Sequence, residues 1–185
     1  MAYPNKTDRA SILAAALEQV ESEGIENLAI RSVAAKLNLA PNALYRYFES
    51  LSVLEAEVAE EIRIQMLKAM QKAVGRKGPS ETIQAICETY LQFAQDRPHA
   101  FSLYLKNSGA ATPQCERNTE FLVAQVARVY GEERATTAAH MLWAQIHGLA
   151  VLLGAGVVAR EEAYARLRFG LETWIDGASK KPTRS

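Results

Sequence analysis

The chain has 185 residues, of which 49% are hydrophobic and 23% charged, a composition typical of a globular protein with a sizeable core. Lys and Arg number 21, as do Asp and Glu, and this balance argues against a histone-like or polybasic membrane-surface protein while allowing a local basic face. With 10 Gly and 6 Pro, low-complexity disorder and turn-dense all-β folds are also disfavoured.

Cysteine usage and hydropathy bear on the cell compartment. Cys87 and Cys115 are too few for a disulfide framework, and the first ten residues hold no apolar signal segment, so a reducing cytoplasm is expected. Residues 135–159 carry no charged side chain, but two histidines and three glycines make the stretch too polar for hydrocarbon. It is therefore expected to be a buried helix and not a membrane span.

Helical periodicity dominates the chain, and prolines punctuate it. Pro41, Pro79, Pro98 and Pro113 each stand at the start of a helix-period segment, where the missing N–H costs little. No alternating strand-like run appears. We predict an all-α fold of about nine helices, at residues 7–23, 30–37, 41–47, 51–74, 80–96, 98–106, 115–130, 132–153 and 160–176. Thr7 is expected to cap the first of these helices, and Ser52 to begin a capping box in the fourth.

Residues 30–48, IRSVAAKLNLAPNALYRYF, predict two short helices joined by a tight turn. Val33 and Leu44 would point inward, while the small Ala34 would let the helices cross closely. Asn38 falls where the turn needs a left-handed backbone, which Asn tolerates second only to Gly. These features meet the requirements of a helix-turn-helix, although another tight helical hairpin could meet part of them.

The second short helix would expose side chains suited to DNA. Asn42 and Arg46 can make bidentate contacts to base edges, Tyr45 and Tyr47 have hydroxyls suited to phosphate oxygens, and Ala43 is small enough not to obstruct approach. The alternative is that Tyr45 lies partly in the core and Arg46 is simply solvated. With residues near the starts of the first two helices, the candidate DNA contacts are Thr7, Arg9, Arg31, Ser32, Asn42, Ala43, Tyr45, Arg46 and Tyr47.

Residues 9–54 resemble the N-terminal domain of the TetR family of transcriptional regulators. The residues that carry the resemblance are Arg9, Ile12, Leu13, Ala15, Ala16, Gly24, Leu28, Arg31, Val33, Ala34, Leu37, Ala43, Leu44, Tyr45, Tyr47, Phe48 and Leu54. The resemblance implies a dimeric, all-helical regulator that binds a palindromic operator in double-stranded DNA. Such a regulator is usually a repressor, released by a small ligand bound in the C-terminal domain.

Three positions depart from the family's usual pattern. Ala29 stands where Thr or Ser usually precedes the second helix, which removes a cap and a candidate phosphate contact. Asn38 replaces the usual Gly of the turn, and Leu51 stands where a Lys commonly follows the recognition helix. Acidic and basic residues balance up to Phe48, so DNA binding would rely on a local basic face.

The remaining chain is expected to hold a ligand. We predict a helix-turn-helix domain at residues 1–50, a connecting helix at 51–74, a helical ligand-binding and dimerisation domain at 75–178, and a disordered tail at 179–185. Trp143, His147 and Gly148 are similar to the Trp…His-Gly pattern of one subgroup of TetR C-terminal domains. Residues 86–95 and 135–159 contain no Lys or Arg, which favours an apolar or aromatic effector.

Each aromatic residue of this part could fill the core or line an apolar pocket. The candidate effector-binding residues are Tyr90, Phe93, Phe101, Tyr104, Trp143 and His147.

Dimerisation is expected through the last two helices. The helix at 132–153 is apolar nearly all round and must be covered on both sides, while the helix at 160–176 adds a one-sided apolar stripe. Four helices from two chains would then form an isologous bundle. The candidate interface residues are Ala144, Gly148, Leu152, Ala155, Leu167, Leu171 and Trp174.

No enzyme activity is predicted from the motifs of the chain. A nucleophile elbow, a phosphate-binding glycine loop, an HExxH motif and paired catalytic carboxylates are all missing, so no catalytic residue or cofactor is assigned. No metal is assigned either, because Cys115 and the histidines lack partners at ligand spacing. Two alternatives stay open: a helical enzyme or cofactor-binding bundle without a recognisable motif, and a helical protein-interaction module.

Overall fold

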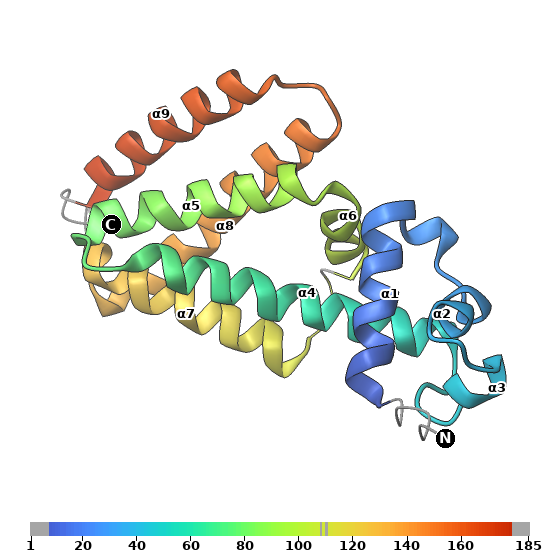
Figure 1. The fold of residues 1–185 in the computed structure, drawn as a ribbon. Coiled ribbons are helices and arrows are strands. Elements are labelled where there is room, and N and C mark those ends of the chain that lie inside the picture. Colours follow the sequence, from blue (N-terminus) through green and yellow to red (C-terminus); the bar gives the residue numbers. More distant parts are fainter. Residues whose placement is uncertain (1–7, 108, 110, 179–185) are drawn as a thin grey trace. The chain divides into compact units, whose positions relative to one another are not determined.

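The computed structural model describes residues 8–107, 109 and 111–178 of the chain. These residues form helices, turns and loops without a strand, which confirms the all-α prediction (Figure 1). The helices are α1 (Arg9–Glu23), η1 (Ile25–Asn27, a 3₁₀ turn), α2 (Ile30–Lys36), α3 (Pro41–Leu44), α4 (Leu51–Val74), α5 (Pro79–Asp96), α6 (Pro98–Lys106), α7 (Pro113–Tyr130), α8 (Glu132–Gly154) and α9 (Arg160–Ala178). Among these described residues, no helix is long and apolar enough to cross a lipid bilayer.

The capping residues differ from those predicted. Asp8 caps α1, because its carboxylate accepts the Ser11 backbone N–H at 2.8 Å, and this bond holds the pKa of Asp8 below its ordinary value. Thr7 lies outside the described residues. In α4 the hydroxyl of Ser50, not Ser52, accepts the backbone N–H of Val53 at 3.2 Å. Both predicted caps therefore lie two residues or fewer from the observed ones.

The described residues divide into two compact units, one with those up to 63 and from 97 to 109, the other with those from 64 to 96 and from 111 to 178. Helix α4 passes from the first unit into the second. The predicted division assigned α6 to the C-terminal domain, whereas the structure groups it with α1 and η1. The reason is apolar packing, because α6 buries Ala100, Phe101 and Leu103 almost completely.

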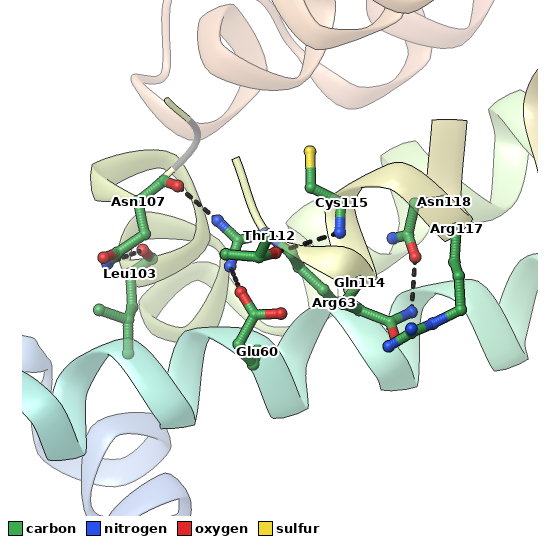
Figure 2. A network of polar contacts seen from close by, with 9 residues as sticks. All are labelled: Glu60, Arg63, Leu103, Asn107, Thr112, Gln114, Cys115, Arg117 and Asn118. Carbon is green, nitrogen blue, oxygen red and sulfur yellow. Dashed lines mark hydrogen bonds and ion pairs between the residues drawn. The ribbon is translucent and has the colours of Figure 1, made fainter. Parts of the chain in front are cut away.

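Polar contacts also hold α6 in the first unit. At its start, the Arg97 guanidinium donates to the Glu21 carboxylate at the end of α1. At its end, Lys106 pairs with Glu55 of α4 at 2.8 Å. The Arg63 side chain is almost fully buried and donates to the backbone carbonyl of Asn107, just after α6 (Figure 2).

Arg63 is compensated in this buried position. It pairs with the Glu60 carboxylate one turn earlier in α4 (Figure 2). Its guanidinium carbon also lies 5.7 Å from the centroid of the Tyr104 ring. A buried cation is tolerated only when charge and hydrogen bonds replace water. The contacts of Arg63 thus fix α6 on α4 at a defined register.

The core of the second unit lies between α5, α7, α8 and α9. Helix α8 contributes Leu142, Ile146 and Leu149 to this core. Gly170, in the middle of α9, has a packing reason, because a Cβ built there would lie 1.8 Å from the Gln145 Nε2 atom of α8. At the start of α7 the buried Gln114 amide donates to the Asn118 side chain at 2.7 Å (Figure 2).

Candidate functional site

The turn between α2 and α3 has the geometry that a helix-turn-helix requires. Asn38 is the one non-glycine residue with a positive φ, +55°, in the part of the chain that the structure describes. Its backbone N–H donates to the carbonyl of Ala35 at 3.0 Å, and the Leu39 N–H donates to that of Ala34 at 2.9 Å. This bond pair is a Schellman motif, which ends α2 and redirects the chain into α3 at Pro41.

Buried side chains hold α3 against the rest of the first unit. Leu44 and Phe48 are fully buried, as is Ala34 in α2, which has the small side chain that a close crossing needs. Helix α3 is shorter than predicted and ends at Leu44, because residues 45–47 form turns, with the Tyr47 N–H donating to the Leu44 carbonyl at 2.9 Å.

The opposite face of this segment is exposed. Asn42 and Arg46 are exposed, Ala43 and Tyr47 are half-buried, and Tyr45 is 51% exposed. Tyr45 is therefore not a core residue, although part of its surface is covered within the chain. The recognition segment presents two side chains able to read bases beside a tyrosine hydroxyl able to bind phosphate.

Five of the predicted DNA contacts have side chains that make no hydrogen bond or ion pair among the described residues: Arg31, Ser32, Asn42, Tyr45 and Arg46. Their donors can bind a ligand without first breaking a contact inside the protein. Lys36, by comparison, pairs with Glu18 at 2.7 Å. The two unpaired guanidiniums, on α2 and just after α3, give this exposed face a local positive charge.

Arg9 has different surroundings from those predicted. Its Nε atom donates to Glu57 of α4 at 3.0 Å, its Nη2 atom donates to the same carboxylate, and its Nη1 atom donates to the backbone carbonyl of Tyr47. Its guanidinium carbon also lies 4.3 Å from the centroid of the Phe48 ring. Arg9 is thus engaged inside the chain, and the sequence carried no sign of Glu57 as its partner.

In the second unit, three predicted effector residues lie together. The Tyr90 hydroxyl on α5 is 2.8 Å from the Nδ1 atom of His147 on α8, and the Trp143 ring lies 4.7 Å from the His147 ring. Burial lowers the pKa of His147, so the imidazole is neutral at pH 7. The cluster therefore joins a neutral imidazole, a phenol and an indole.

Of the other three predicted effector residues, one lies on the same helix as Tyr90 and two belong to the first unit. Phe93 is a buried residue of α5. Phe101 and Tyr104 lie on α6 in the first unit, where their rings stack with centroids 5.6 Å apart. The structure accounts for Phe101 by core packing, since only 4% of its surface is exposed.

The predicted dimer residues divide into two groups. Ala144 and Gly148 on α8 and Ala155 just after it are exposed, and Leu152 on α8 is 38% exposed. On α9, Leu167 and Leu171 are buried in the core of their own chain, which contradicts their assignment to an intermolecular seam. The apolar stripe read from the sequence is the inner face of α9.

Trp174 is also engaged within the chain, because its ring packs 4.4 Å from that of Tyr130 and its carbonyl accepts the Tyr130 hydroxyl. Met141 and Val151 of the nearly all-apolar α8 are exposed, and sequence reasoning missed a further exposed apolar side chain, Phe169. Phe169 is 72% exposed on α9. It lies two residues from both Leu167 and Leu171, so helical periodicity places it on a different face from that buried pair, and the sequence could have shown this.

Comparison with known proteins places these features in a family. Residues 12–54 match the family model described as "Bacterial regulatory proteins, tetR family", and residues 83–172 match "Tetracyclin repressor-like, C-terminal domain". The uncharacterized HTH-type transcriptional regulator YobS of Bacillus subtilis (strain 168) is 25% identical over 171 residues, which cover 90% of each chain.

Two solved structures share the fold. A protein of unknown function from Rhodococcus sp. RHA1 superposes with a TM-score of 0.82 at 21% identity, covering 97% of this chain and 100% of the other. A TetR variant from Acinetobacter baumannii AYE in complex with minocycline has a TM-score of 0.70 at 19% identity, covering 93% and 96%.

Proposed function

This chain belongs to the TetR family of bacterial transcriptional regulators, and from that premise we propose that it is a dimeric repressor whose helix α3 reads a palindromic operator. The observation that carries the proposal is the exposed face of the helix-turn-helix, where five polar side chains have no partner among the described residues. Such a face gains hydrogen bonds on meeting DNA and loses none within the protein.

Within this face we assign two roles. Asn42 and Arg46 read base edges in the major groove, because an amide and a guanidinium can each bond two groups on one base. Arg31, Ser32 and Tyr45 bind phosphate oxygens and fix the register of α3 on the duplex. Ala43 and Tyr47 are half-buried, so their role is to permit close approach of the backbone.

The proposed dimer surface is the outer face of α8. A row of exposed residues on this face is spaced alternately four and three positions apart, as in helices that pack along their length. These residues are Thr137, Met141, Ala144, Gly148, Val151 and Ala155. Apart from its chain neighbours and the backbone of α8 itself, no atom of the described residues lies within 4 Å of a Cβ built on Gly148, so the packing among them does not require this mid-helix glycine. A second α8 crossing closely at the small residues would require it.

The proposed effector is a small, uncharged, aromatic or apolar molecule that binds the second unit near Tyr90, Trp143 and His147. The relative solved with minocycline supports small-molecule binding as a property of this fold. The effector would favour a conformation of the dimer in which the two recognition helices no longer match the spacing of the operator half-sites. It would thereby release the DNA.

Selection from a random pool of duplex DNA tests the proposed function. The purified protein should enrich a palindromic sequence, and the enriched duplex should give an electrophoretic shift that excess specific DNA, but not random DNA, competes away. The Asn42→Ala protein serves as the matched control, and its preference should relax at one position of each half-site. A pool without enrichment would favour the remaining alternatives, an enzyme without a motif or a protein-interaction module.

A further inference from the structure

The Arg9 side chain joins three parts of the first unit. It begins α1, it forks onto the Glu57 carboxylate of α4 through Nε and Nη2, and it donates through Nη1 to the Tyr47 carbonyl after α3. The Phe48 ring covers one face of the guanidinium. Two hydrogen bonds to one carboxylate, a third to a backbone carbonyl and a stacked aromatic ring restrict the conformation of a planar guanidinium, so Arg9 has little freedom to reach another partner.

Helix α3 needs such support from outside. It has only one turn, Pro41–Leu44, which is too short to be stable by its own hydrogen bonds. The carbonyls at the end of a helix lack partners within it. Arg9 satisfies the Tyr47 carbonyl and links it to α4, so the direction in which the segment leaves α3 depends on this side chain.

Charge separates Arg9 from the guanidiniums available for DNA. Glu57 neutralises Arg9, whereas Arg31 and Arg46 have no carboxylate partner among the described residues. The Arg9 side chain is nevertheless 47% exposed. The competing role for Arg9 is therefore a direct contact with a DNA phosphate.

We infer that Arg9 is a positioning residue, which orients the recognition segment through Glu57 and the Tyr47 carbonyl and does not bind DNA phosphate itself. This inference rests on the proposed function, since it concerns how the DNA-reading segment is held. It also assigns Glu57, an acidic residue in a DNA-binding unit, a role that favours DNA binding.

The sign of the Glu57→Gln effect tests the inference. If Arg9 positions α3, removing the carboxylate charge weakens operator binding, about tenfold for loss of a charged hydrogen-bond partner. If Arg9 binds phosphate, the same variant frees a cation and strengthens operator binding. The affinity for the selected operator is measured by fluorescence anisotropy, with Glu55→Gln as the matched control, because Glu55 pairs with Lys106 and not with Arg9.

Salt dependence provides a second readout. Arg9→Lys keeps the charge but cannot make the fork, so the operator affinity should fall while random-duplex affinity and the slope of log affinity against log salt stay unchanged. Arg46→Lys and Arg31→Met are the reference variants, because they show how operator affinity and the salt slope change when an arginine proposed to contact DNA is replaced. A slope that is lower by about one per half-site in Arg9→Met would mean that Arg9 binds phosphate, and would overturn the inference.

Folding and function are controlled separately. Circular dichroism melts show whether each variant is folded at the temperature of the assay, and the conservative Arg9→Lys and Glu57→Gln proteins keep the size of the side chains. If the unmodified protein selects no sequence, the proposed function fails and the inference fails with it. If the unmodified protein selects an operator and Glu57→Gln binds it as tightly or more tightly, only the inference fails.

Discussion

At the scale of single residues, Asn42 and Arg46 carry the sequence information in the proposed mode of binding. Replacing Asn42 by Ala should cost about 1–3 kcal/mol of operator affinity and relax the preference at one position of each half-site. Tyr45→Phe removes a hydroxyl assigned to a phosphate contact, so it should lower the affinity for all DNA sequences by the same factor. Deep sequencing of duplexes selected by each variant measures both effects. Loss of affinity without any change of preference in Asn42→Ala would show that Asn42 does not read bases.

His147 predicts a pH dependence of stability. Its pKa is lowered in the folded protein because burial disfavours the charged imidazole. The unfolded chain therefore binds more protons than the folded one just below about pH 6.5, and the free energy of unfolding falls as the pH drops through that window. Above it, His147 is neutral in both states and contributes no slope.

The His147→Gln protein is the comparison for this prediction. Urea unfolding between roughly pH 7.5 and 5 should show a smaller loss of stability in the variant than in the unmodified protein. Gln retains a hydrogen-bonding group for the Tyr90 hydroxyl, so the difference isolates the titration. Parallel stability curves for the two proteins would mean that His147 takes up its proton equally in the folded and unfolded states.

Sequence reasoning succeeded for residues whose role depends on local geometry. Asn38 was predicted to be left-handed from the turn alone, and the structure bears this out. It did not find the partners of Arg9 or Arg63, because Glu57 and Asn107 are distant along the chain. An exposed Glu on a helix looks the same in the sequence whether it pairs or is solvated.

At the scale of the elements, the first turn of α4 offers a test of how close the DNA backbone lies. Leu51 begins α4 and is half-buried, and it stands where the family commonly has Lys. Leu51→Lys should strengthen binding and steepen the salt dependence of log affinity by about one unit per half-site. Titrations at several salt concentrations measure the slope. An unchanged slope would place residue 51 away from the phosphates.

The positions of the helices could be predicted well from periodicity and proline spacing, but their ends could not. Asp8 lies one residue from the predicted cap Thr7, and Ser50 lies two residues from the predicted cap Ser52. Moving the end of a helix by one or two residues changes no apolar face, so periodicity does not fix the cap. The early end of α3 has a tertiary cause. Burial of both Leu44 and Phe48 and the contact of Arg9 with the Tyr47 carbonyl determine the path after the helix.

At the scale of the whole molecule, the outer face of α8 predicts the assembly. Ala144→Glu places a charge at the centre of the proposed seam, so it should shift the protein from dimer to monomer and weaken operator binding together. Ala124→Glu makes the same change at an exposed alanine of α7 and should leave both properties intact. Multi-angle light scattering gives the mass of each. A dimeric Ala144→Glu protein would exclude this face.

A charge in α9 gives a different expected result. Leu171 is buried in its own chain, so Leu171→Glu should destabilise the second unit by several kcal/mol. The melting temperature should therefore fall whether or not the protein is dimeric. A folded but monomeric Leu171→Glu protein would restore the seam first inferred from the sequence.

The grouping of the helices into units was the least predictable property of the fold. Helix α6 follows α5 in the chain, and its apolar residues would suit either unit. Its place in the first unit follows from contacts that α1 and α4 supply, including the Glu21–Arg97 and Glu55–Lys106 pairs. Apolar periodicity shows that a helix face is buried, but it does not show which element covers that face. For the same reason the apolar stripe of α9 was assigned to a dimer seam and not to the core of its own chain.

The stoichiometry of the complex with the selected duplex tests the central claim, that two copies of this chain read a palindrome through α3, most directly. Sedimentation of the protein with that duplex should give two chains per DNA, and hydroxyl-radical footprinting should protect two symmetric half-sites a whole number of helical turns apart. One chain per duplex at full affinity, or a footprint without two-fold symmetry, would contradict it.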